Sequence, residues 1–177
     1  MTLELAAGGD LGLTLDGSVE RWNQATSDLD ELRIEDQQFG FGFGFGSSRQ
    51  ANFSLRTAAS GSDILAILGR LASEQGEATP GPQRRISTVA FVWNRLPRPA
   101  EGPDLVPEVR VAGFRALVQA VEPELGAAAA ETILGRLAFP SDAPMTQRDR
   151  QLGHEGLVYR LIEADGRFLY LTVRAAP

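Results

Sequence analysis

The sequence predicts an α+β fold: a mostly antiparallel sheet, built from hairpins, with helices packed on one face. Strand-like and helix-like stretches alternate without a strict strand–helix–strand order, which argues against a parallel sheet. Two pairs of strand-like stretches, within 39–57 and 157–173, are separated by short turns, as in hairpins. Hydrophobic residues make up 43% and charged residues 23% of the 177, so a single domain over 1–177 can bury a core.

The most distinctive stretch is Gln38–Ser48, in which Phe alternates with Gly. Successive side chains of a strand point to opposite faces, so four rings would share one face and four glycines the other. A helix would scatter the rings and would carry Gly at every second position, at about 1 kcal/mol each. A strand is therefore predicted here, then a turn near Gly46–Arg49 and a returning strand over 51–57. The rings belong to Phe39, Phe41, Phe43 and Phe45.

Two interpretations of this aromatic face stay open. The four rings could bury about 150–250 Å² each, which favours a structural role in the core with the glycine face admitting another backbone. Alternatively, they line a groove for an apolar ligand or a protein partner. On this second interpretation Phe39, Phe41, Phe43, Phe45 and Trp93 are the candidate binding residues.

The remaining elements follow from periodicity and from helix-breaking residues. Leu32 and Ile34 have even numbers, whereas the Phe residues have odd numbers. Because the side chains of a strand alternate between its two faces, the apolar residues can share one face only if a bulge interrupts the strand within Glu35–Gln38. The apolar segment Ile86–Arg95 is expected to be a central strand. The segment Leu96–Pro107 contains four prolines and is expected to be irregular, either a lid or a linker. Helices are predicted over residues 16–32, 63–74, 107–122 and 123–138, and a final hairpin over 157–173.

One hexapeptide, Ile-Leu-Gly-Arg-Leu-Ala, occurs twice, at 67–72 and at 133–138. The same offset aligns residues 91–93 with 157–159, so a degenerate helix–loop–strand repeat over 61–95 and 127–161 is one hypothesis. The alternative is that a composition rich in Leu, Ala, Gly and Arg produces such a hexapeptide by chance.

The composition excludes several kinds of chemistry. The chain contains no cysteine, which removes disulfides, thiolate nucleophiles and cysteine metal sites. It also contains no lysine, because all 17 basic residues are arginine, and this removes Schiff-base chemistry and the phosphate-binding lysine of a P-loop. With a single histidine and no helix that pairs acids with it, no metal site and no cofactor are expected.

The remaining candidates for acid–base chemistry are few. His154 and Glu155 are adjacent, so on a strand they would point to opposite faces. His154 is therefore expected to be a residue at a strand edge or in a loop without a catalytic duty, and Arg148–Arg150 to be a solvated turn. The acidic residues between Glu20 and Asp36 are expected to form the exposed side of the first helix and its exit.

Charge and the N-terminal segment suggest where the protein acts. A net charge of −6 argues against nucleic acid and anionic membranes as partners. The first ten residues lack the basic and apolar regions of a signal peptide, and no apolar run reaches the roughly 18 residues of a membrane span. A bacterial cytosolic protein is expected.

Three hypotheses of function remain. The leading one is a non-catalytic protein–protein interaction module: an adaptor, a dedicated chaperone or an immunity-type inhibitor that offers a sheet edge or an aromatic face. Its contact regions would be Asp28–Asp36 and the proline-rich segment Leu96–Pro107. The first alternative is a binder or carrier of a small apolar ligand. The second is a small metal-independent cyclase or isomerase.

Overall fold

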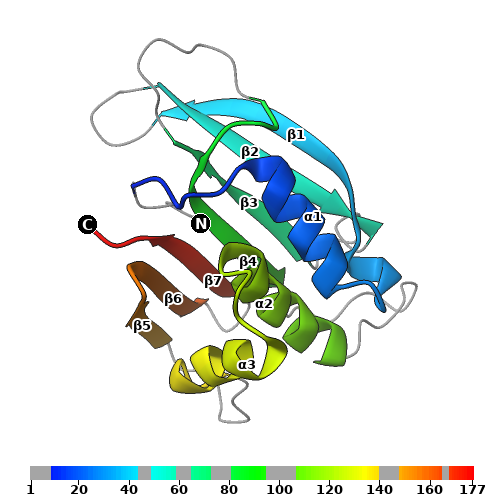
Figure 1. The fold of residues 1–177 in the computed structure, drawn as a ribbon, viewed down its shortest axis with the longest axis vertical. Helices are drawn as coiled ribbons and strands as arrows, with labels where there is room; N and C mark the ends of the chain where they lie inside the picture. The colour runs from blue at the N-terminus through cyan, green and yellow to red at the C-terminus, as the bar shows by residue number, and fades with distance from the viewer. Residues whose placement is uncertain are drawn as a thin grey trace.

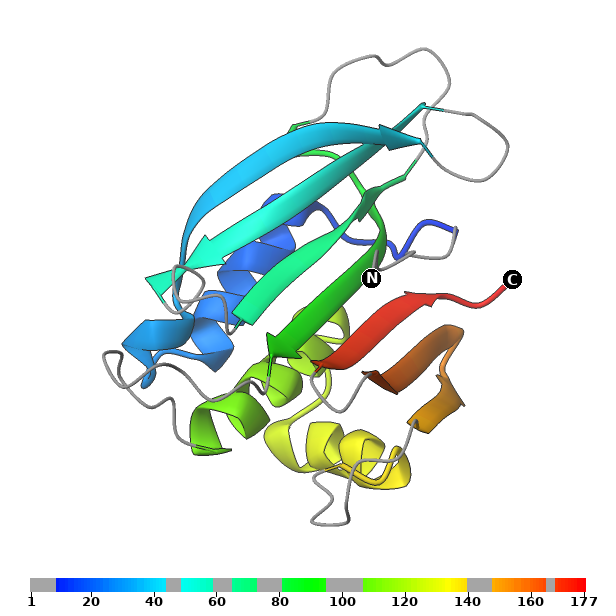
Figure 2. The same cartoon turned by 180° about the vertical axis from the view of Figure 1, so that it is seen from behind.

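The computed structural model describes residues 9–43, 49–58, 65–72, 81–94, 107–139, 148–164 and 168–177, with the backbone alone at 41–43, 49–50, 107–108 and 148. Within these ranges, seven strands form one antiparallel sheet in the order β1-β2-β3-β4-β7-β6-β5. Figures 1 and 2 show that the sheet is strongly twisted. The strands are β1 (Ile34–Phe43), β2 (Arg49–Thr57), β3 (Leu65–Leu71), β4 (Ile86–Asn94), β5 (Arg148–His154), β6 (Leu157–Ala164) and β7 (Phe168–Ala175).

The helices of the described ranges all lie on one face of this sheet, as Figures 1 and 2 show. They are α1 (Leu15–Ala25), α2 (Pro107–Val121) and α3 (Ala127–Arg136), with a short 3-10 turn, η1 (Asp30–Leu32), between α1 and β1. Thr14 caps α1, because its side-chain oxygen accepts a hydrogen bond from the Gly17 N–H at 3.2 Å. The predicted α+β fold, with hairpins and helices on one face, is therefore confirmed.

Aromatic rings join the helices to the centre of the sheet. Phe91 of β4 is fully buried, and its ring lies 5.7 Å from Trp22 of α1 and 4.8 Å from Phe114 of α2, centroid to centroid. Gly113 lets α2 approach, since a Cβ there would overlap the Phe91 ring. Trp22 also donates its indole N–H to the Leu32 carbonyl at 2.6 Å, so a buried polar group is satisfied.

Several expectations about individual elements are confirmed. The pairing of β1 with β2 shifts register between Ile34 and Asp36, where the change of parity predicts a bulge. Strand β4 is fourth of the seven, at the centre of the sheet. The helix predicted from Pro107 and the final hairpin are both present, as α2 and as β6–β7.

The helix predicted over 63–74 is wrong, because residues 65–71 form strand β3. Buried residues alternate along β3 with a period of two, and β3 pairs with β2 on one side and β4 on the other. The second copy of the hexapeptide, at 133–138, falls in α3 and the turn after it. Since the two copies adopt different secondary structures, the hexapeptide marks no structural repeat.

Two further expectations need correction. The first helix ends at Ala25 rather than near residue 32, because Thr26 leaves helical geometry and η1 leads into β1. The segment Arg148–Arg150 belongs to edge strand β5 rather than to a turn. Phe45 and residues 96–106 of the proline-rich segment lie outside the described residues.

Candidate functional site

Strand β1 forms one edge of the sheet, and it carries an exposed aromatic ring. Among the described side chains, Phe39 is the large hydrophobic residue that is exposed, at 37%. Phe39 is therefore not part of the fully buried core. Phe39 lies opposite Phe53 in the pairing of β1 with β2, so its side chain faces the helices. Two residues earlier on the same face, the Gln37 side chain donates a hydrogen bond to the Asp16 carboxylate in the first turn of α1. Phe39 lies two residues beyond this contact and is only partly covered.

The other predicted binding residues are placed differently. Phe41 and Phe43 lie in β1, opposite Ala51 and Arg49, with their side chains outside the described part. Trp93 lies in β4, where it is 6% exposed and stacks on Phe91 at 6.5 Å between ring centroids. The structure therefore does not bring Trp93 and Phe39 together on one accessible surface.

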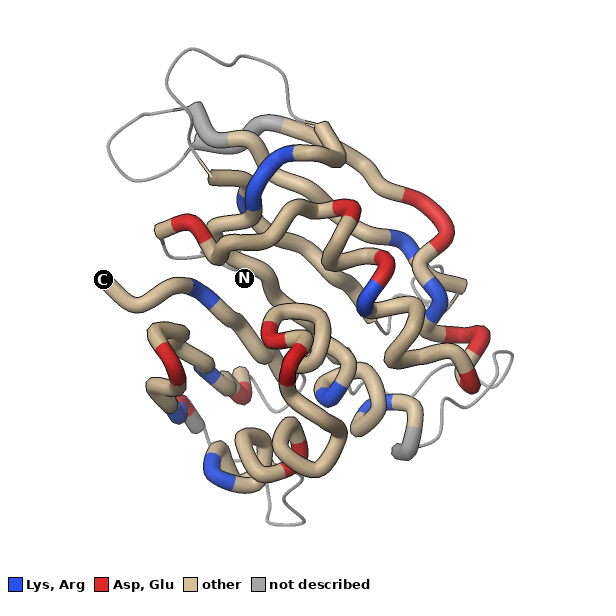
Figure 3. Tube along the Cα trace, viewed as in Figure 1, with Lys and Arg blue, Asp and Glu red and all other residues tan. Residues whose placement is uncertain are grey.

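The two edges of the sheet differ in charge. Strand β5 begins with Arg-Asp-Arg, and Asp149 forms an exposed ion pair with Arg160 on the neighbouring strand β6. The Arg160 guanidinium, mainly through its hydrogen bond, lowers the pKa of the Asp149 carboxyl. Strand β1 carries acidic residues only at its start, and from Gln37 to Phe43 it has no charged residue and no proline. Figure 3 shows the negative charge at η1 and at the start of β1.

An apolar hollow lies between the helices and the sheet. It contains about 370 Å³ of space when the part open to solvent is included, but its cavity volume is only about 20 Å³. Room for one or two waters is far less than a small-molecule ligand needs. Its walls come from the segment just before α1, from α1 and α2, and from strands β1 to β4. Leu13, Trp22, Phe53 and Leu117 are among the lining residues, whereas Phe39 and Trp93 are not.

A second group of polar and titratable side chains lies near the opposite edge of the sheet, around Glu122. This residue directly follows the last turn of α2, where its N–H donates to the Val118 carbonyl at 2.8 Å. Its side chain is only 11% exposed. One oxygen, Oε1, accepts the Tyr159 hydroxyl at 2.5 Å, and the other, Oε2, lies 3.5 Å from His154 Nε2. Three elements, α2, β5 and β6, therefore meet at one carboxylate.

Tyr159 is the hydrogen-bond donor of this group. Burial, and then the Glu122 carboxylate that accepts its hydrogen bond, raise the pKa of the phenol well above its ordinary value of 10. The hydroxyl therefore keeps its proton at physiological pH and fixes the orientation of the Glu122 carboxylate.

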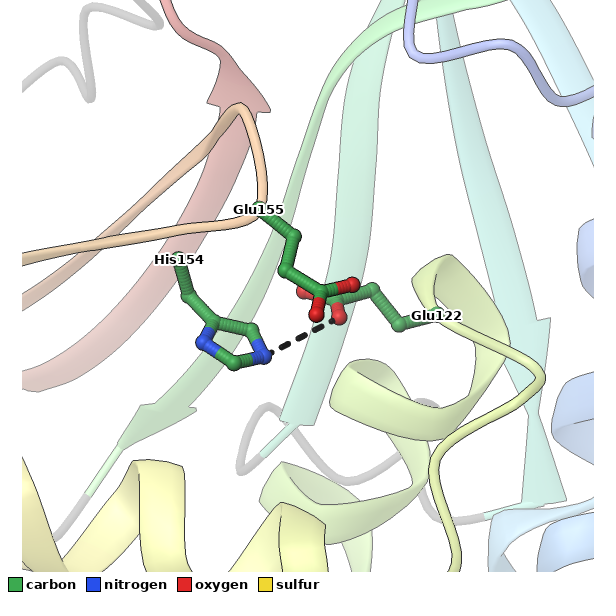
Figure 4. A group of neighbouring side chains, drawn as sticks. All are labelled: Glu122, His154 and Glu155. Atoms are coloured by element: carbon green, nitrogen blue, oxygen red, sulfur yellow. Dashed lines mark ion pairs between the residues drawn. The ribbon is translucent and has the colours of Figure 1, made fainter.

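A tight turn brings Glu155 to the same place. Glu155 and Gly156 connect β5 to β6, and both have positive φ angles, 45° and 81°. This geometry is that of a type I′ hairpin turn, in which the first residue is usually Asn, Asp or Gly, so that Glu155 is unfavourable there. The expectation that His154 and Glu155 point apart is wrong, because the turn ends the alternation and both side chains converge on Glu122 (Figure 4). Sequence reasoning missed Glu122 and Tyr159, since nothing local links them to His154.

Comparison with models of protein families, with curated proteins and with solved structures found no match to this chain. Within the described residues, every helix is too short or too polar to cross a membrane.

Proposed function

We propose that this protein is a non-catalytic protein–protein interaction module that binds its partner along the edge of strand β1. The observation that carries the proposal is Phe39, a large apolar side chain left exposed on a ten-residue edge strand. A long edge strand presents unpaired backbone groups to which an extended segment of another chain can add.

The contrast between the two edges supports the choice of β1. Natural sheets protect their edges with charged residues and prolines, and the Arg-Asp-Arg start of β5 fits that pattern. From Gln37 onwards, β1 lacks both devices. The space beside Gly40 is also empty, since a Cβ built at this residue would meet no atom within 4 Å. Strand addition at Gly40 would therefore meet no charged side chain and no crowding around that position.

The acidic residues beside this edge indicate what the partner carries. Five exposed carboxylates precede the uncharged half of β1, with Arg33 the one basic residue among them. A partner segment should therefore combine apolar side chains, for contact with Phe39, with basic residues that face this acidic group. Because exposed charges are screened by salt, they should mainly speed association. The carboxylates belong to Asp28, Asp30, Glu31, Glu35 and Asp36.

The experiment compares capture of partners from cell extract by the wild-type protein, by Phe39→Lys and by Gln151→Lys. Gln151 is exposed on the opposite edge strand, so its substitution is the matched control. We expect a protein retained by the wild type and by Gln151→Lys, and retained at least about tenfold less by Phe39→Lys, with an association rate that falls as salt rises. Equal retention by all three proteins would refute binding at β1.

Binding of a small apolar ligand is the second candidate function, and the apolar hollow is the observation that favours it. The small free volume opposes it. Native mass spectrometry of the purified protein tests it directly: a retained apolar compound, together with no captured protein, would favour the carrier over the interaction module.

A further inference from the structure

We propose that Glu122, His154 and Glu155 form a binding site for a divalent transition-metal ion of the zinc type. The three residues offer one imidazole nitrogen and two carboxylate oxygens, and these atoms all lie within 4.8 Å of one another. The site is separate from the β1 edge.

The distances fit a metal centre after a small contraction. Zinc binds nitrogen and carboxylate oxygen at about 2.0–2.2 Å, so two ligands of a tetrahedral ion lie roughly 3.4 Å apart. His154 Nε2 and Glu122 Oε2 are already 3.5 Å apart. Glu155 is exposed in its turn, so rotation of its side chain can bring the third ligand atom inward. Figure 4 shows the three side chains pointing toward one another.

The histidine nitrogen that faces the carboxylates lacks a hydrogen bond. His154 Nε2 is inaccessible to solvent and has no hydrogen-bond partner. Glu122 Oε2 lies 3.5 Å away, which is close enough for an ion pair, but the two atoms form no hydrogen bond. A buried nitrogen without a hydrogen-bond partner destabilises the folded state unless another group, such as a metal ion, interacts with it. A metal ion between Nε2 and the two carboxylates would satisfy it.

The charges around Glu122 also favour a cation. Glu122 lies at the C-terminal end of α2, where the helix dipole opposes a negative charge, and its carboxylate is mostly buried beside Glu155. The Tyr159 hydroxyl occupies Oε1 and so leaves Oε2 for the ion, the arrangement by which outer-shell hydrogen bonds orient metal ligands.

The donor set selects the kind of metal. One imidazole with two carboxylates and no thiolate suits zinc and its first-row neighbours, whereas magnesium and calcium prefer oxygen ligands alone. Three protein ligands would leave a fourth position for water or for a group of a bound partner.

The test uses the fact that His154 is the one histidine of the 177 residues and that the chain contains no cysteine. Protein without an affinity tag is titrated with ZnCl₂ at pH 7.5, while the imidazole resonances of His154 are followed by NMR and the melting temperature is recorded. We expect the resonances to shift with a one-to-one stoichiometry and the melting temperature to rise, with no effect of MgCl₂.

Variants separate a built site from binding to a single surface histidine. Glu155→Gln changes an exposed residue and should weaken zinc binding at least about tenfold, because one of three ligands is lost. Glu124→Gln, at an exposed neighbour of Glu122, is the control and should bind as the wild type does. Unchanged resonances under a tenfold excess of zinc would overturn the proposal, and so would equal affinity of wild type and Glu155→Gln.

Discussion

Gly69 and Gly135 hold the same place in the two copies of the hexapeptide, yet their surroundings differ completely. In β3, a Cβ at Gly69 would overlap the Thr88 carbonyl oxygen and lie 2.5 Å from the Phe53 ring. In α3, a Cβ at Gly135 would meet no atom within 4 Å. The role of each glycine is therefore set by what packs on it and not by its immediate sequence.

We predict that Gly69→Ala lowers the free energy of unfolding by about 1–3 kcal/mol, since Phe53 and the β4 backbone must move to admit a methyl group. Gly135→Ala, the matched control, should leave it unchanged or raise it by up to about 1 kcal/mol, because alanine is the better helix former. Urea unfolding of the three proteins measures both effects. Equal losses in the two variants would contradict the packing account.

The ion pair between Asp149 and Arg160 predicts a pH dependence. Arg160 lowers the pKa of Asp149 in the folded protein, so the pair stabilises the fold above the ordinary aspartate pKa of 3.8 and loses its effect as pH falls below that value. Both groups are largely exposed, so the contribution should stay within about 1 kcal/mol. Thermal melts of wild type and Asp149→Asn should differ at pH 6, and the difference should shrink as pH falls below 3.8 toward the lowered pKa of Asp149. A difference that grows toward pH 3 would contradict this.

At the scale of secondary-structure elements, the β1–β2 hairpin joins a buried strand to an exposed one. Phe39 and Phe53 are directly opposed in the pairing register, but Phe53 is 3% exposed and Phe39 is 37% exposed. One phenylalanine therefore belongs to the core, whereas its cross-strand neighbour is partly exposed.

Alanine substitution of these two phenylalanines should separate stability from binding. Phe53→Ala removes a buried ring and should cost about 3–5 kcal/mol of unfolding free energy. Phe39→Ala should cost far less, about 1 kcal/mol or below, while it weakens capture of the partner. Circular-dichroism melts with the capture assay measure both. A loss for Phe39→Ala as large as that for Phe53→Ala would show that the ring is structural.

The sequence predicts elements well where the hydrophobic pattern is unambiguous. Strand β4 and helix α2 have long apolar patterns, and both occur where they are expected. Residues 65–71 fit a helical face and an alternating strand equally well, and pairing with both β2 and β4 decides the outcome. The start of strand β5 is not predicted from the sequence, because the charged residues Arg148–Arg150 are also typical of a solvated turn. An edge strand tolerates such charged residues.

At the scale of the whole molecule, one sheet with helices on a single face leaves two edges with different properties. The β1 edge carries the exposed Phe39, and the β5 edge ends beside the Glu122 group. Sequence reasoning proposed the first region from the Phe–Gly pattern. It could not propose the second, because Tyr159 and Glu122 are 37 residues apart and only the packing of α2 against the β5–β6 hairpin brings them together.

Amide hydrogen exchange tests most directly whether a partner adds along β1. The exchange of β1 (34–43) and of the opposite edge β5 (148–154) is measured in the free protein and in the complex with the captured partner. The account predicts that β1 amides become protected by the partner while those of β5 do not change. Protection confined to β5 or to the helices, with β1 unchanged, would contradict it.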